Sequence, residues 1–275
     1  MKPKWLVEKD LFLDTEPRLI ERLVKKGYTV KVVQYIPMDT DYSKFEKMFD
    51  KNDCVVYYGS LNLAMELKKR FKWIPGVYGD IEKYRCTNYY PHFGTNHINS
   101  DYICMTFGEL PEKKDALFER MGLIFVRPDS ILKEFTGVVT SLYNFEAAYK
   151  LMGFYSDVVK PDLPILISTV KDIQKEWRFI VVDGKVISGS LYRIKEFEDT
   201  LHEPCLDSNA LDFAKQMAGL YNPERVWVLD ICLCELGYKV LEIGCFSFAG
   251  MYGNDLDVII DEVSRVAVEQ YESCI

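Results

Sequence analysis

The 275-residue sequence predicts a mixed α/β (α+β) fold, in which a small N-terminal α/β unit precedes two antiparallel-sheet lobes. Three observations lead to this prediction. Strand-like and helix-like segments alternate through the first part of the chain, two strand pairs with tight turns follow between residues 176 and 243, and a helical pattern occupies residues 256–272. We place the domain boundary at residue 108, so that the domains span residues 1–108 and 109–275.

Composition and charge narrow the class of protein. At 48% hydrophobic and 28% charged residues, the chain is long enough for two modest cores. No apolar run approaches the roughly 20 residues of a membrane span, and the first residues lack the apolar stretch of a signal peptide, so we expect a soluble, cytoplasmic protein with no membrane partner. A formal charge of -8 argues against nucleic-acid binding. The eight cysteines lack zinc-type spacing, and we expect reduced thiols. The sequence does not indicate an oligomeric state.

The N-terminal unit is expected to contain a small parallel sheet, because its strands alternate with helices. Thr15 and Pro17 are typical of a helix start, and Gly27 follows the helix end. Residues 72–108 are rich in aromatic and turn-forming residues, and we interpret them, with His92 and His97, as a loop packed on aromatic side chains. The expected strands cover residues 5–7, 29–33 and 54–60, and the expected helices cover residues 15–24, 42–49 and 61–71.

The next segment delivers two cations after a buried strand. A helix over residues 111–121 is followed by a strand over residues 123–126, with Arg127 at its end and Lys133 in the loop beyond. Cations beside a glycine-containing loop suit phosphate oxygens, because side chains and free backbone amides converge there. The pattern is not a P-loop. On spacing alone, a solvated loop is the favoured explanation of both cations.

A hairpin follows a helix over residues 142–152 and a strand over residues 163–168. Its first strand carries Glu176 and Arg178, its type I′ turn is Asp183-Gly184, and its returning strand ends at Arg193. The alternative to a functional interpretation is a structural ion pair between Glu176 and Arg178 on one strand face.

A second hairpin follows a helix over residues 207–221. Its strands, at residues 225–234 and 239–243, each carry a carboxylate within an apolar run, namely Asp230 and Glu242. A buried carboxylate is costly unless a cation, a metal or hydrogen-bond donors compensate it. Two of them on paired strands predict a divalent-cation site of the kind that a magnesium nucleotide needs. Neutralisation by Lys239 or Arg225 is the alternative.

The order of these pieces resembles the ATP-grasp superfamily. Four segments, at residues 125–129, 133–137, 176–178 and 242–252, resemble its clade named for two arginines and one lysine, whose members are common in phage and bacterial genomes. The resemblance covers most of the chain. It implies an ATP-grasp fold, with a small pre-grasp domain before two antiparallel lobes whose helices help to clasp a nucleotide.

The resemblance also implies an activity. It is that of an ATP- and Mg2+-dependent, ADP-forming ligase, which activates a small-molecule or peptide carboxylate as an acyl phosphate for attack by an amine or thiol. By position it assigns Arg127, Lys133, Glu176 and Arg178 to nucleotide binding, Arg178 and Arg193 to catalysis, and Asp230 and Glu242 to magnesium.

One residue departs from the family pattern. Many ATP-grasp enzymes have Glu-x-Asn on the second metal-binding strand, and Gly244 occupies the position of that Asn here. A second ion would then depend on Asn254, Asp255 or water, or would not bind. Two rival hypotheses therefore stay open, namely a catalytically degenerate nucleotide-binding or interaction protein on the same scaffold, and a kinase-like transferase acting on a hydroxyl group.

Overall fold

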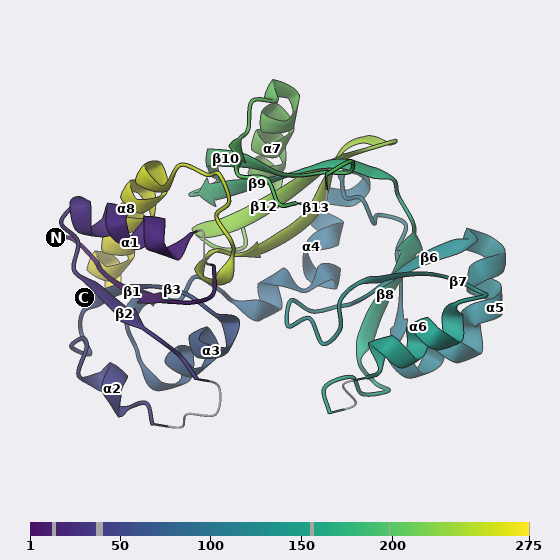
Figure 1. Cartoon of the computed structure of the whole chain (residues 1–275), viewed down its shortest axis with the longest axis horizontal. Coiled ribbons are helices and arrows are strands. Elements are labelled where there is room, and N and C mark those ends of the chain that lie inside the picture. Colours follow the sequence, from purple (N-terminus) through teal and green to yellow (C-terminus); the bar gives the residue numbers. More distant parts are fainter. Residues whose placement is uncertain (13–14, 37–40, 155–156, 198, 275) are drawn as a thin grey trace.

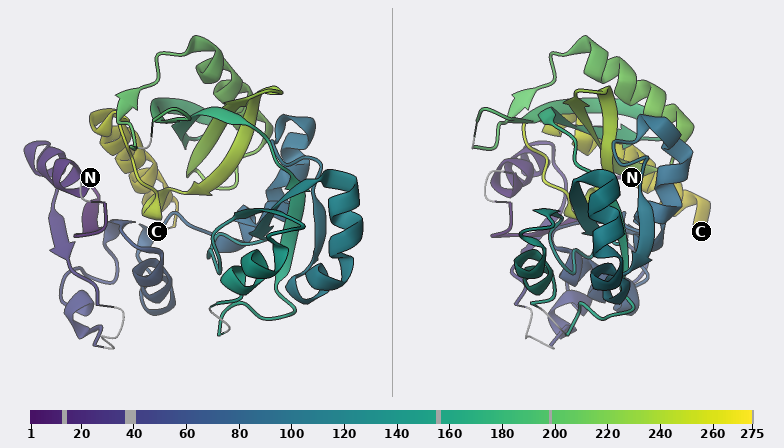
Figure 2. Two further views of the ribbon diagram at one scale, coloured as in Figure 1. Left: turned by 45° about the vertical axis from the view of Figure 1, so that its right-hand side comes forward. Right: turned by 90° about the vertical axis from the view of Figure 1, so that its right-hand side faces the viewer.

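The computed structural model describes residues 1–12, 15–36, 41–154, 157–197 and 199–274. The strands of this part of the chain form three sheets, one parallel and two antiparallel. Figures 1 and 2 show the N-terminal unit at one end of the molecule, the sheet that contains β9 and β12 in the middle, and the sheet that contains β6 and β8 at the other end. The predicted mixed α/β class is confirmed.

The N-terminal sheet is parallel, as the sequence predicts, with the strand order β2-β1-β3-β4. One of its faces packs against α2 and α3, and the other packs against α1 and α8. The elements of this unit are β1 (Lys4–Glu8), α1 (Glu16–Lys25), β2 (Val30–Val33), α2 (Ser43–Glu46), β3 (Cys54–Tyr58), α3 (Leu61–Arg70), β4 (Ile74–Gly76) and, from the other end of the sequence, α8 (Leu256–Cys274).

The central sheet is antiparallel and contains both predicted hairpins. Its strand order is β11-β10-β9-β12-β13. Asp183 and Gly184 have φ values of 48° and 74°, which is the left-handed pair that a type I′ turn requires. The strands are β9 (Ile173–Val182), β10 (Lys185–Ile194), β11 (Glu203–Pro204), β12 (Val226–Cys234) and β13 (Gly237–Cys245).

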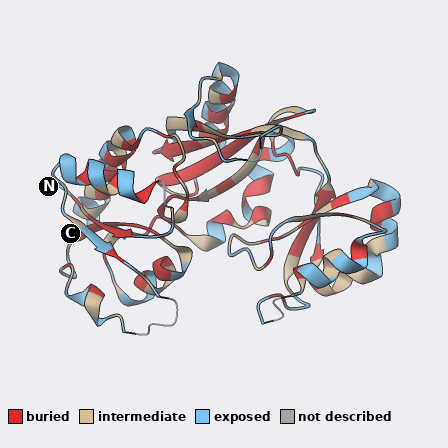
Figure 3. Cartoon of the chain, viewed as in Figure 1, coloured by how far each residue is buried: buried red, intermediate tan, exposed pale blue. Residues whose placement is uncertain are grey.

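The two faces of the central sheet enter different cores, because successive side chains of a strand point to opposite sides. On β9, Trp177 and Phe179 face α7 (Ser208–Leu220) and α4 (Cys86–Phe93), whereas Ile180 and Val182 face α8 and the N-terminal unit. Figure 3 shows the resulting continuous burial along the middle strands. Glu176 and Arg178 of β9 and Asp230 of β12 lie on the second face, next to its apolar part.

The third sheet is antiparallel, with the strand order β5-β8-β6-β7. Helices α5 and α6 cover one of its faces and close a separate core with Ile124 and Val126. The opposite face carries Arg127 at the end of β6, next to α4. The elements are β5 (Ile103–Thr106), α5 (Leu110–Met121), β6 (Leu123–Pro128), β7 (Val138–Ser141), α6 (Phe145–Met152) and β8 (Pro164–Thr169).

The prediction of a loop over residues 72–108 was wrong. This segment contains β4, α4, β5 and the 3-10 turns Ile81–Tyr84 and Gly94–Asn96. Pro91 within α4 and the aromatic-rich composition obscured the helix, whose buried residues include Tyr89 and Tyr90. The parallel sheet ends with β4, and β5 pairs with β8, so the chain leaves the N-terminal unit before residue 108. The domain boundary stays a prediction.

Two further expectations concern membrane spans and cysteines. Within the described ranges, no helix combines the length and the apolar character that crossing a membrane would require. All eight cysteines lie in these ranges and have free thiols. The packing interpretation of most of them holds, because five are buried.

Candidate functional site

A cavity of about 250 Å³ lies where the central sheet meets the loop after β6 and the loops after β1 and β13. It brings together four of the residues predicted from the sequence, Arg127, Lys133, Arg178 and Glu242. Its other lining residues are Phe12, Ile131, Val228, Ile243, Gly244, Cys245, Phe248, Ala249, Gly250 and Tyr252. The cavity is therefore charged on one side and apolar or aromatic on the other.

Arg127 contributes a buried guanidinium with little compensation. Its side chain is 16% exposed, and its nearest anion is Glu242, with Nη2 3.7 Å from Oε2. Across the described residues, no hydrogen bond to this guanidinium is formed, although it carries five N–H donors. An arginine stays charged when it is buried. The arrangement leaves its donors available to an anion in the cavity.

Lys133 is the second cation on this side of the cavity. It follows β6 in a loop and has a φ of 53°, which is uncommon for a residue other than glycine. No ion pair of Lys133 is formed with any residue that the structure describes. Residues in such conformations gather at ligand-binding sites.

Asp129 fixes the loop that carries these two cations. Its carboxylate is buried and accepts hydrogen bonds from the backbone N–H and the hydroxyl of Thr87, at 2.9 and 2.6 Å, and from Arg85 at 3.2 Å. These contacts join the end of β6 to the start of α4. The sequence places Asp129 two residues after Arg127, but nothing in it indicates this partner.

Arg178 is held on three sides. Its Nε and Nη2 donate to the two carboxylate oxygens of Asp230 at 2.8 and 2.7 Å, and its Nη1 donates to the carbonyl of Gly250 at 3.1 Å. The guanidinium also lies 5.0 Å from the ring centroid of Tyr252 and 5.7 Å from that of Tyr192. Within the described part of the chain, three of its five donors are thus engaged with protein, and two are left for a ligand in the cavity that it lines.

Burial dominates the electrostatics of Asp230. It raises the pKa of Asp230, the carboxylates of Glu242 and Glu176 add to the effect, and the Arg178 guanidinium opposes it. Burial also raises the pKa of Tyr252. Tyr252 has a φ of 49° and stacks on Tyr192 with ring centroids 4.7 Å apart. Neither tyrosine is among the site residues predicted from the sequence.

Glu176 and Arg193 pair with each other outside the cavity lining. Glu176 is buried and accepts a hydrogen bond from the Tyr192 hydroxyl at 2.6 Å and another from Arg193 Nη1 at 2.8 Å. Arg193 itself is 64% exposed. The alternative ion pair between Glu176 and Arg178 is not formed within the described chain, because each of them pairs with a residue on a neighbouring strand.

The other simple alternative from the sequence also fails. Arg225 pairs with Asp183 and Glu269, and Lys239 donates to the carbonyl of Thr95, so neither neutralises Asp230 or Glu242. Gly244 faces Val228, and an added Cβ there would lie 3.0 Å from a Val228 methyl carbon.

Carboxylate, histidine and cysteine side chains do not gather in groups of three or more around a metal position in the parts of the chain that the structure describes. Asp230 and Glu242 are direct partners on β12 and β13, as the hairpin predicts. Only Glu242 borders the cavity, and its side chain is 34% exposed, whereas that of Asp230 is 2% exposed. Carboxylate oxygens of this kind suit magnesium.

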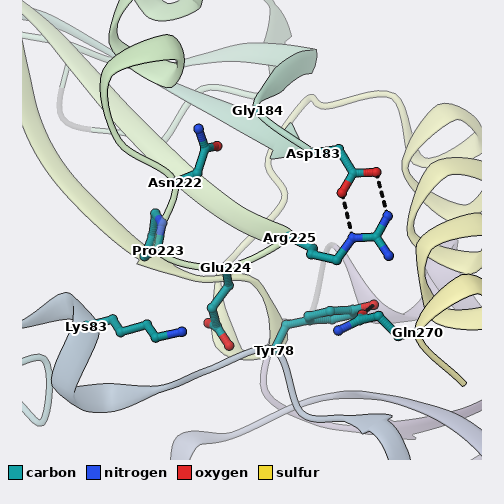
Figure 4. Close-up of a pocket in the computed structure, with 9 residues that line it drawn as sticks. All are labelled: Tyr78, Lys83, Asp183, Gly184, Asn222, Pro223, Glu224, Arg225 and Gln270. Atoms are coloured by element: carbon teal, nitrogen blue, oxygen red, sulfur yellow. Dashed lines mark hydrogen bonds and ion pairs between the residues drawn. The ribbon is translucent and has the colours of Figure 1, made fainter. Parts of the chain in front are cut away.

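A wider cavity, of about 620 Å³, lies at the other end of the first hairpin (Figure 4). Its charged groups are engaged. Arg225 makes a two-bond pair with Asp183, and Glu224 accepts hydrogen bonds from the backbone N–H groups of Gly79 and Asp80 and from the Tyr84 hydroxyl. None of the residues predicted for the site borders this cavity, so the smaller cavity is the better candidate.

Comparison with known proteins identifies the fold that the resemblance of the sequence implies. A family model described as ATP-grasp domain, R2K clade family 3, matches residues 67–263. Comparison with curated protein sequences finds no match. Among solved structures, the chain is similar to the D-cycloserine synthetase DcsG, with a TM-score of 0.59, 15% identity, and coverage of 96% of this chain and 99% of that one.

Two further structures have comparable similarity. The D-alanine–D-alanine ligase from Bacillus anthracis complexed with ATP gives a TM-score of 0.59 at 14% identity, and the ATP-grasp ligase PsnB complexed with a minimal precursor gives 0.57 at 13%. In both cases the match covers 98% of this chain and 99% of the other. At these identities the similarity concerns the fold.

Proposed function

The chain belongs to the R2K clade of ATP-grasp domains, and from that premise we propose that it is an ATP- and Mg2+-dependent, ADP-forming ligase. The observation that carries the proposal is the pair of cations at the cavity. Arg127 is enclosed with one carboxylate at 3.7 Å, and Lys133 has no ion-pair partner among the described residues. A buried cation with so little compensation is costly, and the phosphate oxygens of a nucleotide would compensate both groups.

In the proposed reaction, a carboxylate oxygen of the substrate attacks the γ-phosphorus of ATP. The bond from that phosphorus to the β-γ bridging oxygen breaks, and ADP leaves with the bond's electron pair. An amine or thiol then attacks the acyl carbon of the acyl phosphate, and inorganic phosphate departs as the attacking group loses its proton to water. Both steps depend mainly on positioning and charge stabilisation, so no protein nucleophile is needed.

Each charged residue of the cavity would have a separate role in these two steps. Arg127 and Lys133 would hold the triphosphate, and the two free N–H donors of Arg178 would bind the transferred phosphoryl group and the acyl phosphate. Arg193 lies outside the cavity lining, where it would position Glu176 and thereby the strand that carries Arg178.

Magnesium fits the carboxylate of Glu242, which borders the cavity and keeps a partly exposed side chain. When bound, the ion would supply positive charge that neutralises part of the charge on the phosphates. The chain itself would keep water from the acyl phosphate through the apolar side of the cavity, where Phe12 and Phe248 lie.

The substrates are proposed at the level of chemical class. The three neighbours described above are named for D-cycloserine synthesis, for D-alanine–D-alanine ligation and for a complex with a precursor. We propose a small-molecule or peptide carboxylate and an amine or thiol for this chain, and a cytoplasmic location where ATP is supplied.

Two measurements test the function. ATP with magnesium should raise the melting temperature, since a ligand at 100 times its Kd adds about 2.7 kcal/mol to the free energy of unfolding. The double variant Arg127→Met, Lys133→Met should lose this shift, while Lys185→Met, which removes an exposed lysine outside the cavity lining, should keep it. An unchanged shift in the double variant would contradict the assignment of the nucleotide site.

Hydroxylamine tests carboxylate activation without knowledge of the natural nucleophile. It converts an acyl phosphate to a hydroxamate, so a panel of amino acids and short peptides with ATP, magnesium and hydroxylamine should yield hydroxamate and ADP in equal amounts. Stable phosphorylation of a hydroxyl compound instead would favour the kinase-like alternative.

The degenerate scaffold is the second candidate function. It is favoured by Gly244, which supplies no metal ligand, and by the engagement of both Asp230 oxygens with Arg178. It predicts the ATP-dependent melting shift together with no release of ADP for any substrate of the panel.

A further inference from the structure

Three charged residues form a row across the middle of the central sheet. Arg178 on β9 lies directly opposite Asp230 on β12, and Asp230 lies directly opposite Glu242 on β13. Direct cross-strand partners project from the same face of a sheet. Asp230 therefore has a guanidinium on one side and a second carboxylate on the other.

Asp230 has already committed both oxygens to the guanidinium. The two hydrogen bonds, at 2.8 and 2.7 Å, form a parallel pair, and the Asp230 side chain is 2% exposed. Arg178 is itself fixed by the carbonyl of Gly250 and by the rings of Tyr192 and Tyr252. Movement of Asp230 toward a metal ion would leave this buried guanidinium without its counterion.

The residues that could replace a missing ligand lie outside the cavity. The side-chain amide N–H2 of Asn254 donates to the carbonyls of Arg178 and Met251, at 3.3 and 2.9 Å, and its Oδ1, the atom that could bind a metal, is buried without a hydrogen-bond partner among the described residues. Asp255 accepts the backbone N–H groups of the first turn of α8 through Oδ1, as a helix cap does. Neither residue borders the cavity, and Gly244, which does, has no side chain that could bind a metal ion.

Glu242 differs from Asp230 in each of these respects. It borders the cavity, its side chain is 34% exposed, and its nearest cation, Arg127, is 3.7 Å away. We propose that the chain binds a single divalent cation with its nucleotide, through Glu242, and that the fixed guanidinium of Arg178 takes the place of a second cation beside Asp230. This inference rests on the proposed function, because the ion enters with the nucleotide.

Counting bound ions tests the inference without measuring activity. The protein is saturated with the non-hydrolysable analogue AMPPNP and Mn2+, unbound ligand is removed by ultrafiltration, and Mn2+ is measured by electron paramagnetic resonance after acid release. We expect one Mn2+ per protein–nucleotide complex. Two ions, or none, would overturn the inference while leaving nucleotide binding intact; an analogue that does not bind would refute the proposed function as well.

Conservative variants identify the ligand. Glu242→Gln should weaken Mn2+ binding at least tenfold with the analogue still bound, whereas Asp230→Asn should leave the count at one. A drop with Asp230→Asn comparable to that with Glu242→Gln would overturn the assignment.

The role of Arg178 has its own test. Arg178→Met frees the Asp230 carboxylate, so the count should rise toward two, while Arg193→Met, which breaks an ion pair of the same sheet outside the cavity, should leave it at one. A folded Arg178→Met protein that still binds one ion would refute the replacement of a cation by Arg178. If that variant does not fold, the wild-type count and the comparison of Glu242→Gln with Asp230→Asn decide.

Discussion

Replacing Arg178 with methionine should destabilise the fold strongly even in the absence of nucleotide. The change keeps most of the aliphatic stem but removes the two bonds to Asp230, the bond to Gly250 and the contacts with two tyrosine rings. The carboxylate of Asp230, only 2% exposed, is then left without a counterion.

The size of the expected loss in unfolding free energy follows from the burial of Asp230. Removing one partner of a buried ion pair costs about 3–5 kcal/mol, because the remaining charge stays desolvated. For a chain of this size, roughly 2 °C of melting temperature is lost per kcal/mol, so we expect a decrease of about 6–10 °C. The matched variant Arg193→Met removes an arginine whose side chain is 64% exposed. The buried carboxylate of Glu176 keeps its hydrogen bond from Tyr192, so we expect a smaller loss of roughly 1–2 kcal/mol.

Differential scanning fluorimetry without ligand, supported by urea unfolding, measures both variants. A second change, Asp230→Leu in the Arg178→Met background, should recover much of the loss, since it removes the uncompensated charge. The reasoning would be refuted if Arg178→Met melted within 2 °C of the wild type, or if Arg193→Met cost as much.

The pH dependence supplies an independent check. Burial raises the pKa of Asp230 to about 6 in the folded chain, from 3.8, even with Arg178 opposing it. A raised pKa means that the protonated carboxyl stabilises the fold below about pH 4, and that this contribution is lost as the pH rises through about 6. Without Arg178 the pKa rises further, so the difference in unfolding free energy between the variant and the wild type should widen from pH 5 to pH 8.

Four other changes have defined expectations. Arg127→Met should leave the ligand-free melting temperature unchanged or raise it by a few degrees, because no hydrogen bond of that guanidinium is lost within the described structure; a decrease comparable to that of Arg178→Met would argue against an uncompensated cation. The same change should weaken ATP binding, measured by calorimetry, about tenfold to a hundredfold, as the loss of a charge-assisted contact predicts, and Lys133→Met should act in the same direction. Gly253→Ala should lower the free energy of unfolding, measured in urea, by about 1–3 kcal/mol, because the added Cβ would lie 2.4 Å from the backbone of His202. Gly219→Ala is the control: it lies in α7 with no atom within 4 Å of the added Cβ, so the change should be neutral or stabilising by up to about 1 kcal/mol.

Local patterns in the sequence were sufficient for most of the fold. The Asp183-Gly184 turn sets the register at the start of the first hairpin, and the continuous apolar run over residues 179–182 on β9 is typical of a strand that is buried on both faces. The alternation of strands and helices in the N-terminal unit predicted its parallel sheet, because parallel strands need a long connection, usually a helix, between them. The helix α4 was missed, because Pro91 and a run of aromatic residues mask its period.

The sequence predicted which residues belong to the candidate site, but it did not predict which of their side chains pair with each other. Glu176 and Arg178 are two residues apart and suggested a pair, yet the partners are decided by the register between strands, which places Arg178 opposite Asp230 and Arg193 opposite Glu176. Such contacts join residues 52 and 17 positions apart, and no local pattern records them.

The position of α8 has a consequence for biosynthesis. Residues of β1 such as Trp5 and Val7 share one core with Ile260 and Val263 of α8, and the indole N–H of Trp5 donates to the hydroxyl of Ser264, 259 positions later. Since α1 covers only part of this face, the N-terminal sheet cannot finish burying it until α8 has left the ribosome. Translation would hold the first strands in a half-covered intermediate that chaperones can engage, and loss of α8 would expose apolar surface at the other end of the sequence.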